Sequence, residues 1–306
     1  MKAGFVALVG RPNAGKSTLL NKLVGEKLAI VSDKPQTTRN RIAGARNFGP
    51  APGAPEGGQV VFVDTPGVHR PLHRLNVRMM DVAVEALREV DLVAAVVDAS
   101  EPSGAGDRFL MEMVRRSSQP RVLILNKVDL VDKADLLPRI AAYDRDVGFA
   151  AIVPVSALKG LNMDRLEEVL LSHLPEGQPL YPEDYLTDQP ERFFVAEIVR
   201  EQVLQQTHAE LPFSTAVVVD RFEEPDENGL LRLYCSILVD RDSQKPILVG
   251  KGGSRIKAIG TAARQELERF FDTRVFLDVH VKVRRDWRED ERTLDELGLP
   301  AKRRKR

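Results

Sequence analysis

The sequence predicts an α/β domain with a mostly parallel sheet, followed by a smaller α+β domain. In the first half, apolar runs such as 5–9, 60–63 and 121–125 alternate with helical patterns, as strands do in parallel sheets with crossover helices. Three prolines between 175 and 182 then interrupt the chain, and proline ends helices and stiffens linkers. Beyond them the pattern changes to a helix, two strands, two helices and a last strand.

Composition agrees with two soluble domains. The chain has 306 residues, 43% hydrophobic and 29% charged, which is more than one ordinary core holds and typical of folded proteins. We expect a first domain at 1–175, a linker at 176–190, a second domain at 191–298 and a basic tail at 299–306. A single cysteine, Cys235, excludes an internal disulfide framework. Together with the lack of an 18-residue apolar run or a targeting segment, it predicts a cytoplasmic protein.

A glycine-rich loop follows the first predicted strand. Residues 10–17 read G-R-P-N-A-G-K-S, which matches G-x-x-x-x-G-K-[ST] between a buried strand and a helix. Its backbone N–H groups and the helix N-terminus can cradle phosphates, while Lys16 reaches the β- and γ-phosphates and Ser17 ligates Mg²⁺. The predicted nucleotide contacts of this loop are Gly10, Arg11, Pro12, Asn13, Ala14, Gly15, Lys16, Ser17 and Thr18.

Two further segments have the features of nucleotide-sensing loops. The polar segment 32–39 contains Thr37 and Thr38, of which Thr38 is the preferred second hydroxyl ligand of Mg²⁺, although sequence alone barely separates them. Strand 60–63 ends in the run 64–67, D-T-P-G. Its carboxylate can hold Mg²⁺, and the Gly67 N–H can bind the γ-phosphate. The predicted metal ligands are Ser17, Thr38 and Asp64, the predicted catalytic groups are Lys16, Thr38 and Gly67, and Thr65 and Pro66 are expected at the nucleotide.

Hydrolysis is expected to be slow. Many switch GTPases carry a water-orienting glutamine where this chain has Val68, whose side chain cannot form the required hydrogen bond. His69 is a polar substitute or a solvated loop residue. Asn13 is a hypothetical ligand for a monovalent cation such as K⁺.

Two later motifs select the base. Residues 126–129, N-K-V-D, follow the strand 121–125. The Asp129 carboxylate can accept from guanine N1–H and the exocyclic amine, which adenine cannot match. Lys127 can pack over the ring, and Asn126 can tie this loop to residues 10–17. After strand 151–155, Ser156, Ala157 and Leu158 place a backbone N–H for guanine O6, so GTP and GDP are the predicted nucleotides.

The second domain contains a glycine turn between two predicted helices. Residues 250–253 read G-K-G-G, and a G-x-x-G turn in an α-β-β-α-α-β order is typical of a KH module, in which a nucleic-acid backbone approaches the glycines. Five bases and no acid occur between 243 and 265, which favours an anionic polymer. The predicted RNA contacts are Gly250, Lys251, Gly252, Gly253, Arg255, Ile256 and Lys257. Ile247, Ile256 and Ile259 are expected to form an apolar groove beside them.

Two C-terminal features have open interpretations. Trp287 either stacks on a base or docks the C-terminal segment. The basic tail, which ends in 302–306, is a solvated end or a contact for phosphate or an acidic membrane surface.

The ordered motifs of both halves resemble the bacterial Era family. The similarity rests on G-R-P-N-A-G-K-S, Q-T-T-R, D-T-P-G-V-H, N-K-V-D, S-A-L and G-K-G-G, and extends to the ending W-R-E-D-E-R-T-L-D-E-L-G-L. Ala14, commonly valine in the family, and the proline- and glycine-rich loop 49–58 depart from its pattern.

The resemblance implies a Ras-like P-loop GTPase domain followed by a type II KH domain. It also implies binding of GTP, GDP and Mg²⁺, recognition of single-stranded RNA near the 3′ end of small-subunit ribosomal RNA, and a role in assembling the small ribosomal subunit. We expect a monomer, cytoplasmic or peripheral at the inner face of the cell membrane. Two alternatives remain open: a nucleotide-gated RNA-binding module whose hydrolysis is incidental, and a membrane-associated regulatory GTPase.

Overall fold

The chain forms two compact units. A computed structural model describes residues 1–68, 73–207, 211–299 and 301. One unit comprises Met1–Val31, Thr38–Leu72 and Met79–Asp188, and the other comprises Ser32–Thr37, His73–Arg78 and Gln189–Arg306.

A six-stranded sheet organises the first unit. The strands lie in the order β2-β3-β1-β4-β5-β6; only β2 runs antiparallel to its neighbour, which confirms the mostly parallel sheet. The strands are β1 (Lys2–Gly10), β2 (Ile42–Phe48), β3 (Gly58–Asp64), β4 (Leu92–Asp98), β5 (Arg121–Asn126) and β6 (Ala151–Pro154). The carboxyl ends of parallel strands share one edge of the sheet, so the loops after β1, β3, β5 and β6 come together there.

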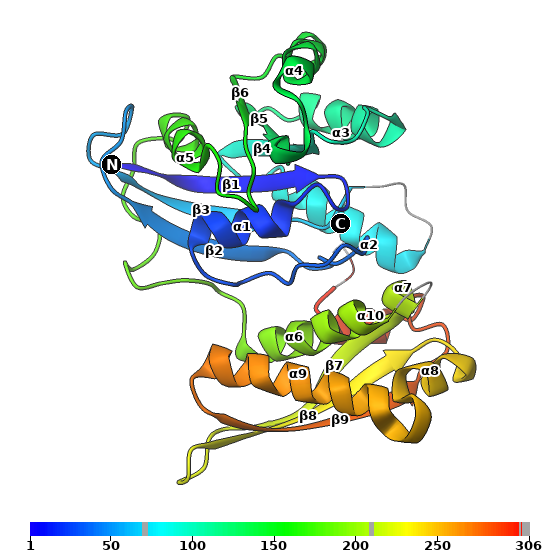
Figure 1. The fold of residues 1–306 in the computed structure, drawn as a ribbon. Helices are drawn as coiled ribbons and strands as arrows, with labels where there is room; N and C mark the ends of the chain where they lie inside the picture. The colour runs from blue at the N-terminus through cyan, green and yellow to red at the C-terminus, as the bar shows by residue number, and fades with distance from the viewer. Residues whose placement is uncertain (69–72, 208–210, 300, 302–306) are drawn as a thin grey trace, which may run out of the picture. The chain divides into compact units, whose positions relative to one another are not determined.

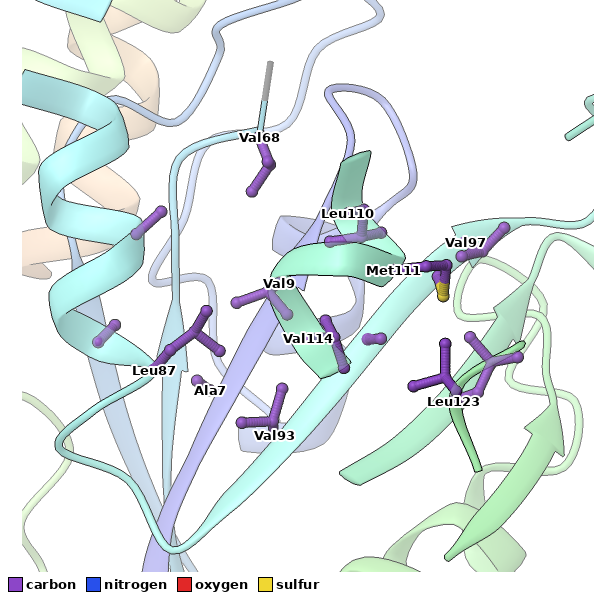
Figure 2. Packing of buried hydrophobic residues seen from close by; sticks show 14 of the residues in the cluster. Ala7, Val9, Val68, Leu87, Val93, Val97, Leu110, Met111, Val114 and Leu123 are labelled. Atoms are coloured by element: carbon purple, nitrogen blue, oxygen red, sulfur yellow. The ribbon is translucent and has the colours of Figure 1, made fainter. Parts of the chain in front are cut away.

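Helices cover both faces of this sheet (Figure 1). They are α1 (Lys16–Val24), α2 (Arg74–Ala86), α3 (Ala105–Arg115), α4 (Lys133–Val147) and α5 (Met163–Ser172). On one face, side chains of α2, α3 and α4 form a continuous apolar cluster with the strands, including Leu87, Leu110, Val114 and Leu123 (Figure 2). Helices α1 and α5 pack against the strands with Leu19, Leu20, Leu166 and Leu170 fully or almost fully buried.

The second unit has a three-stranded sheet with two long helices on one face (Figure 1). Strand β8 pairs antiparallel with β7 and parallel with β9, and α6 and α9 pack over them. The predicted α-β-β-α-α-β order is confirmed, with the short helices α7 and α10 added. The elements are α6 (Glu191–Gln206), α7 (Leu211–Ser214), β7 (Thr215–Glu223), β8 (Leu230–Val239), α8 (Lys245–Val249), α9 (Ser254–Phe271), β9 (Arg274–Val283) and α10 (Glu291–Glu296).

Trp287 belongs to the interior of the second unit. Its side chain is fully buried, and its indole N–H donates to the Ser214 carbonyl over 3.0 Å. This geometry matches the docking interpretation rather than the base-stacking one. Within the described ranges, no helix combines the length and hydropathy that crossing a membrane requires.

Candidate nucleotide-binding and RNA-binding sites

The glycine-rich loop connects β1 to α1 and is held closely by its surroundings. Gly15 is left-handed, with φ of 90° at the start of α1, and a Cβ there would lie 2.3 Å from Asn126 Nδ2. A Cβ on Gly10 would lie 2.3 Å from the Val96 carbonyl oxygen. Both positions therefore require glycine for steric reasons. The Lys16 ammonium donates to the carbonyls of Gly10 (3.1 Å) and Arg11 (3.0 Å).

Three oxygen-bearing side chains converge beside this loop. Ser17 Oγ donates to Asp64 Oδ2 over 2.7 Å and lies 2.7 Å from Thr38 Oγ1, which in turn donates to Asp64 Oδ2 over 3.4 Å. Asp64 is fully buried, and its Oδ1 has no hydrogen-bond partner among the described residues. Thr37 is directed elsewhere, since its hydroxyl donates to the Lys34 carbonyl over 2.6 Å. The structure thus places Thr38, and not Thr37, with the other two predicted metal ligands.

Burial is the main cause of the pKa shifts of Lys16 and Asp64. It lowers the pKa of the Lys16 ammonium, and the Asp64 carboxylate partly offsets this effect. It raises the pKa of Asp64 against the opposing effects of the Lys16 charge and of the hydroxyl groups of Ser17 and Thr38. Both shifts disfavour charge, because both groups lie out of contact with water.

The segment after β3 packs onto the glycine-rich loop. A Cβ on Gly67 would lie 2.8 Å from the Pro12 backbone nitrogen, so the two backbones are in close approach. The Val68 N–H donates to the Gly10 carbonyl over 3.0 Å, and its side chain joins the apolar cluster of Figure 2. Pro66 is also buried, and Thr65 turns its hydroxyl toward the Leu8 carbonyl of β1 (2.9 Å). His69 lies outside the described residues.

Asn126 joins three loops. Its Nδ2 donates to the Ala14 carbonyl over 2.9 Å, and its Oδ1 accepts from the Ala157 N–H over 3.0 Å. The predicted tie between 126–129 and the glycine-rich loop is therefore present, and it extends to 156–158. Ser156 is buried and closes that loop by accepting from the Lys159 N–H over 3.1 Å, whereas Leu158 is exposed.

The remaining predicted residues lie around this core. Lys127 is left-handed, with φ of 65°, and its ammonium is 2.5 Å from Asp98 Oδ2. Asp129 follows on a surface turn at 128–130. Arg11 pairs with the buried Asp107 of α3 over 2.9 Å, and Asn13 is exposed.

Two partners of these residues, Asp98 and Asp107, are not among the residues predicted from the sequence. Asp98 had a detectable signal, because it ends strand β4 as Asn126 ends β5, and the two lie side by side in the register. Asp107 had none, since an acidic residue in the first turn of a helix is ordinary.

The glycine turn of the second unit lies between α8 and α9. Gly250, Gly252 and Gly253 all have positive φ (73°, 60° and 79°). A Cβ on Gly252 or Gly253 would meet nothing within 4 Å, so the turn is open on that side, whereas one on Gly250 would lie 2.9 Å from the Arg255 backbone nitrogen.

Basic side chains surround the turn. Lys251, Arg255 and Lys257 are exposed, and Arg255 also donates to the Ile247 carbonyl over 2.6 Å. The expected apolar groove is wrong in one member: Ile259 is fully buried in the core of the unit, which leaves Ile247 and the half-buried Ile256 at the surface. Residues 302–306 of the basic tail lie outside the described residues.

Family models match both halves of the chain. A family model described as a 50S ribosome-binding GTPase matches residues 5–127, and a KH domain model matches residues 210–288. GTPase Era of Geobacter metallireducens is 50% identical over 297 residues, covering 97% of each chain, and GTPase Era of Staphylococcus haemolyticus is 45% identical over 298 residues with the same coverage.

Solved structures are similar over almost the whole chain. A crystal structure of Era in complex with MgGDPNP and nucleotides 1506–1542 of 16S ribosomal RNA has a TM-score of 0.93 at 40% identity, covering 98% of this chain and 100% of that one. A variant of Aquifex aeolicus Era bound to GDP·AlF₄⁻ has a TM-score of 0.92 at 40% identity and the same coverage. The protein therefore has a Ras-like GTPase domain followed by a KH domain, is a GTPase, and belongs to the GTPase Era family.

Proposed function

We propose that this GTPase binds single-stranded RNA near the 3′ end of small-subunit ribosomal RNA and assists assembly of the small ribosomal subunit, with GTP hydrolysis timing its release. The observation that carries the proposal is the open glycine turn at 250–253, bordered by exposed basic side chains, on a chain that also holds a complete set of GTPase motifs. Support for the RNA comes from the similar Era structure, which contains 16S ribosomal RNA.

The oxygen cluster fits Mg²⁺. Ser17, Thr38 and Asp64 present hydroxyl and carboxylate oxygens within hydrogen-bonding distance of one another, and hard divalent cations prefer oxygen ligands. The buried Oδ1 of Asp64, which has no hydrogen-bond partner among the described residues, is a further oxygen that a cation could use. Bound there, Mg²⁺ would neutralise charge on the phosphates, and the protein's part is to orient these three groups.

Phosphate binding follows from the loop geometry. Lys16 already directs its ammonium toward the carbonyls of Gly10 and Arg11, and a phosphate chain in the loop would give this buried cation an anionic partner. Backbone N–H groups of residues 13–18 and of Gly67 would bind the phosphate oxygens. Because Gly67 approaches Pro12 so closely, a γ-phosphate would contact both the glycine-rich loop and the segment after β3.

Base recognition is assigned to 126–129 and 156–158. Asp129 would accept from guanine N1–H and the amine, the Lys127 stem would lie on the ring, and the Ala157 N–H would donate to O6. Asn126 holds these loops and the phosphate loop in one arrangement.

Slow intrinsic turnover suits a timer. The Val68 side chain is buried in the apolar cluster, so the attacking water needs another orienting group, such as a backbone group, an ion or a partner. We assign a K⁺ site to Asn13 as one such source; equal hydrolysis rates in K⁺ and Na⁺ buffers would exclude it.

RNA binding tests the proposal directly. The full-length protein in its GTP-bound form is titrated with a single-stranded oligonucleotide of the 3′ end of the host's small-subunit ribosomal RNA, and with a scrambled sequence. If about four phosphates are engaged, the affinity for RNA should fall with salt with a log–log slope near −3. Lys257→Ala and Gly252→Asp should weaken binding at least tenfold, because one removes a cation and the other adds bulk and negative charge at the open turn.

Arg269→Ala is the matched control. It removes a cation from the far end of the same helix, α9, where Arg269 pairs with Glu266. Equal losses in Lys257→Ala and Arg269→Ala would show that the protein binds RNA through net charge and not through the turn.

Turnover separates the timer from the nucleotide-gated module. GTP hydrolysis is measured with and without small ribosomal subunits, and RNA affinity in the GTP and GDP states. The timer predicts faster hydrolysis with subunits and a difference in affinity between states. Unchanged hydrolysis together with equal affinities would overturn it.

A further inference from the structure

A short turn after β4 contacts the lysine of the base-recognition motif. This 98–101 turn contains Asp98, Ala99, Ser100 and Glu101. The Lys127 ammonium lies 2.5 Å from Asp98 Oδ2, while Asp98 Oδ1 accepts from the Ser100 N–H (2.8 Å) and from its hydroxyl (2.6 Å). The side chain of Asp98 is only 11% exposed and that of Lys127 32% exposed. Both oxygens of the carboxylate are thus occupied in a largely water-free position.

Neighbouring backbone groups fix the turn in place. Asp98 and Asn126 are paired residues at the ends of β4 and β5, and the Ala99 N–H donates to the Asn126 carbonyl over 2.8 Å. From α4, the Arg139 guanidinium donates to the carbonyls of Ala99 and Glu101. The position of Asp98 is therefore set by strand pairing and by a helix, not by Lys127 itself.

The electrostatics keep Asp98 ionised. Burial acts to raise its pKa, but the hydrogen bonds from Lys127 and Ser100 outweigh burial and hold the pKa of Asp98 below its ordinary value. The carboxylate consequently stays available to Lys127 throughout the neutral range.

A surface cavity is also lined by this turn and by the residues that follow Lys127. The cavity has a volume of about 400 Å³, and its lining residues are Ser100, Asp129, Leu130, Val131, Asp132, Asp135 and Arg139. The left-handed backbone of Lys127 sends its side chain toward Asp98. The lysine stem is thus fixed at both ends, at its backbone directly after β5 and at its ammonium on the 98–101 turn.

We propose that Asp98 is a positioning residue for guanine-nucleotide binding: it holds the ammonium of Lys127 so that the alkyl stem is pre-organised as the surface on which the purine stacks. This inference rests on the proposed role of Lys127 at the base. A free lysine side chain samples many rotamers, and restricting them before binding removes an ordering cost that nucleotide binding would otherwise carry. The contribution concerns stacking, so it is independent of which hydrogen-bonding groups the purine presents.

The test measures dissociation constants of GDP and of inosine diphosphate, which lacks the exocyclic amine, on the full-length protein. Asp98→Ala should weaken both ligands by the same factor, about tenfold. Asp98→Asn keeps an oxygen acceptor for Ser100 but removes the negative charge that pairs with the Lys127 ammonium, so it should weaken binding less than Asp98→Ala. Asp129→Ala, by contrast, should reduce the preference for GDP over inosine diphosphate. Glu112→Ala is the matched control, since it also removes a carboxylate from an ion pair of this domain, that with Arg116, at an exposed position of α3.

A double-mutant cycle distinguishes positioning from a structural role. In a Lys127→Ala background, Asp98→Ala should have no further effect on GDP affinity, because there is no stem left to position. An undiminished loss in that background, or no loss in the wild-type background, would overturn the inference. If Lys127→Ala and Asp129→Ala also leave GDP affinity unchanged, the proposed base site itself fails; if they weaken it and Asp98→Ala does not, only the positioning role fails.

Discussion

Removing the Asn126 side chain should weaken the nucleotide site strongly, because this one amide connects two of its loops. It bridges the Ala14 carbonyl and the Ala157 N–H, and all three residues are 2–3% exposed. In Asn126→Ala, both backbone groups lose their partner where water does not replace it. Each unsatisfied buried group costs about 1–3 kcal/mol, so the assembled site should lose about 2–6 kcal/mol.

The loss should appear mainly in nucleotide affinity. The two loops can relax in the free protein and rehydrate their backbone groups, whereas a bound nucleotide requires both loops in place. A cost of about 2 kcal/mol already corresponds to roughly thirtyfold in affinity. Fluorescence titration with a labelled GDP measures this loss, and urea unfolding of the same variant measures the part that falls on stability.

Two further variants separate the bridge from general damage. Asn126→Asp keeps the acceptor for Ala157 but replaces the donor to Ala14 by a carboxylate oxygen, so it should be at least as harmful as alanine. Asn47→Ala also removes an amide that bridges two groups, since it donates to the Glu183 carbonyl over 2.9 Å and accepts from Gln59 over 3.0 Å, but Asn47 is exposed and Gln59 keeps its bond to the Tyr181 carbonyl. If Asn126→Ala changed affinity less than twofold with unchanged stability, the bridge would not hold the site together.

Four other predictions concern the buried side chains of Asp64, Cys235 and Trp287. Because burial raises the pKa of Asp64, protons should compete with Mg²⁺ at a higher pH than for an ordinary aspartate with a pKa of 3.8, so Mg²⁺ titrations of GTPase activity should give weaker affinity as pH falls. The stability of the nucleotide-free protein should change with the opposite sign: the folded state holds this proton more tightly than the unfolded chain, so stability should rise as pH falls through the window above 3.8. Burial raises the pKa of Cys235 to about 12, so alkylation at neutral pH should occur only as fast as the protein unfolds, and rapid labelling of the native protein would contradict this. Trp287→Ala should destabilise the second unit by about 3–5 kcal/mol in urea unfolding, because it deletes a fully buried indole together with its hydrogen bond to the Ser214 carbonyl.

The elements that sequence predicted well are those whose local pattern is unambiguous. Helix α9 (Ser254–Phe271) and strand β9 (Arg274–Val283) are the last helix and strand expected in the second domain, because a glycine turn starts one and strong β-formers fill the other. The four nucleotide motifs lie on one sheet edge because parallel strands carry their loops there.

Helices α2 and α4 have no counterpart among the predicted elements. Helix α4 (Lys133–Val147) contains Pro138 in its interior, which locally disfavours a helix. Its helical state depends on packing, since Tyr143 and Val147 belong to the apolar cluster over the sheet. Such long-range contacts are not visible in a local pattern.

Val68 shows how packing changes the interpretation of a motif. From sequence, valine is only the absence of a water-orienting glutamine. In the structure its side chain is 1% exposed and lies among Val9, Leu110 and the other apolar residues of the cluster, while its N–H is bound to Gly10 (Figure 2). A glutamine at 68 would have to bury its amide in that cluster or pull the segment away from the phosphate loop, and an unpaired buried amide is costly. Val68→Gln should therefore lower stability without raising the GTPase rate, because the fold directs this position away from the phosphates and leaves water orientation to groups outside that side chain.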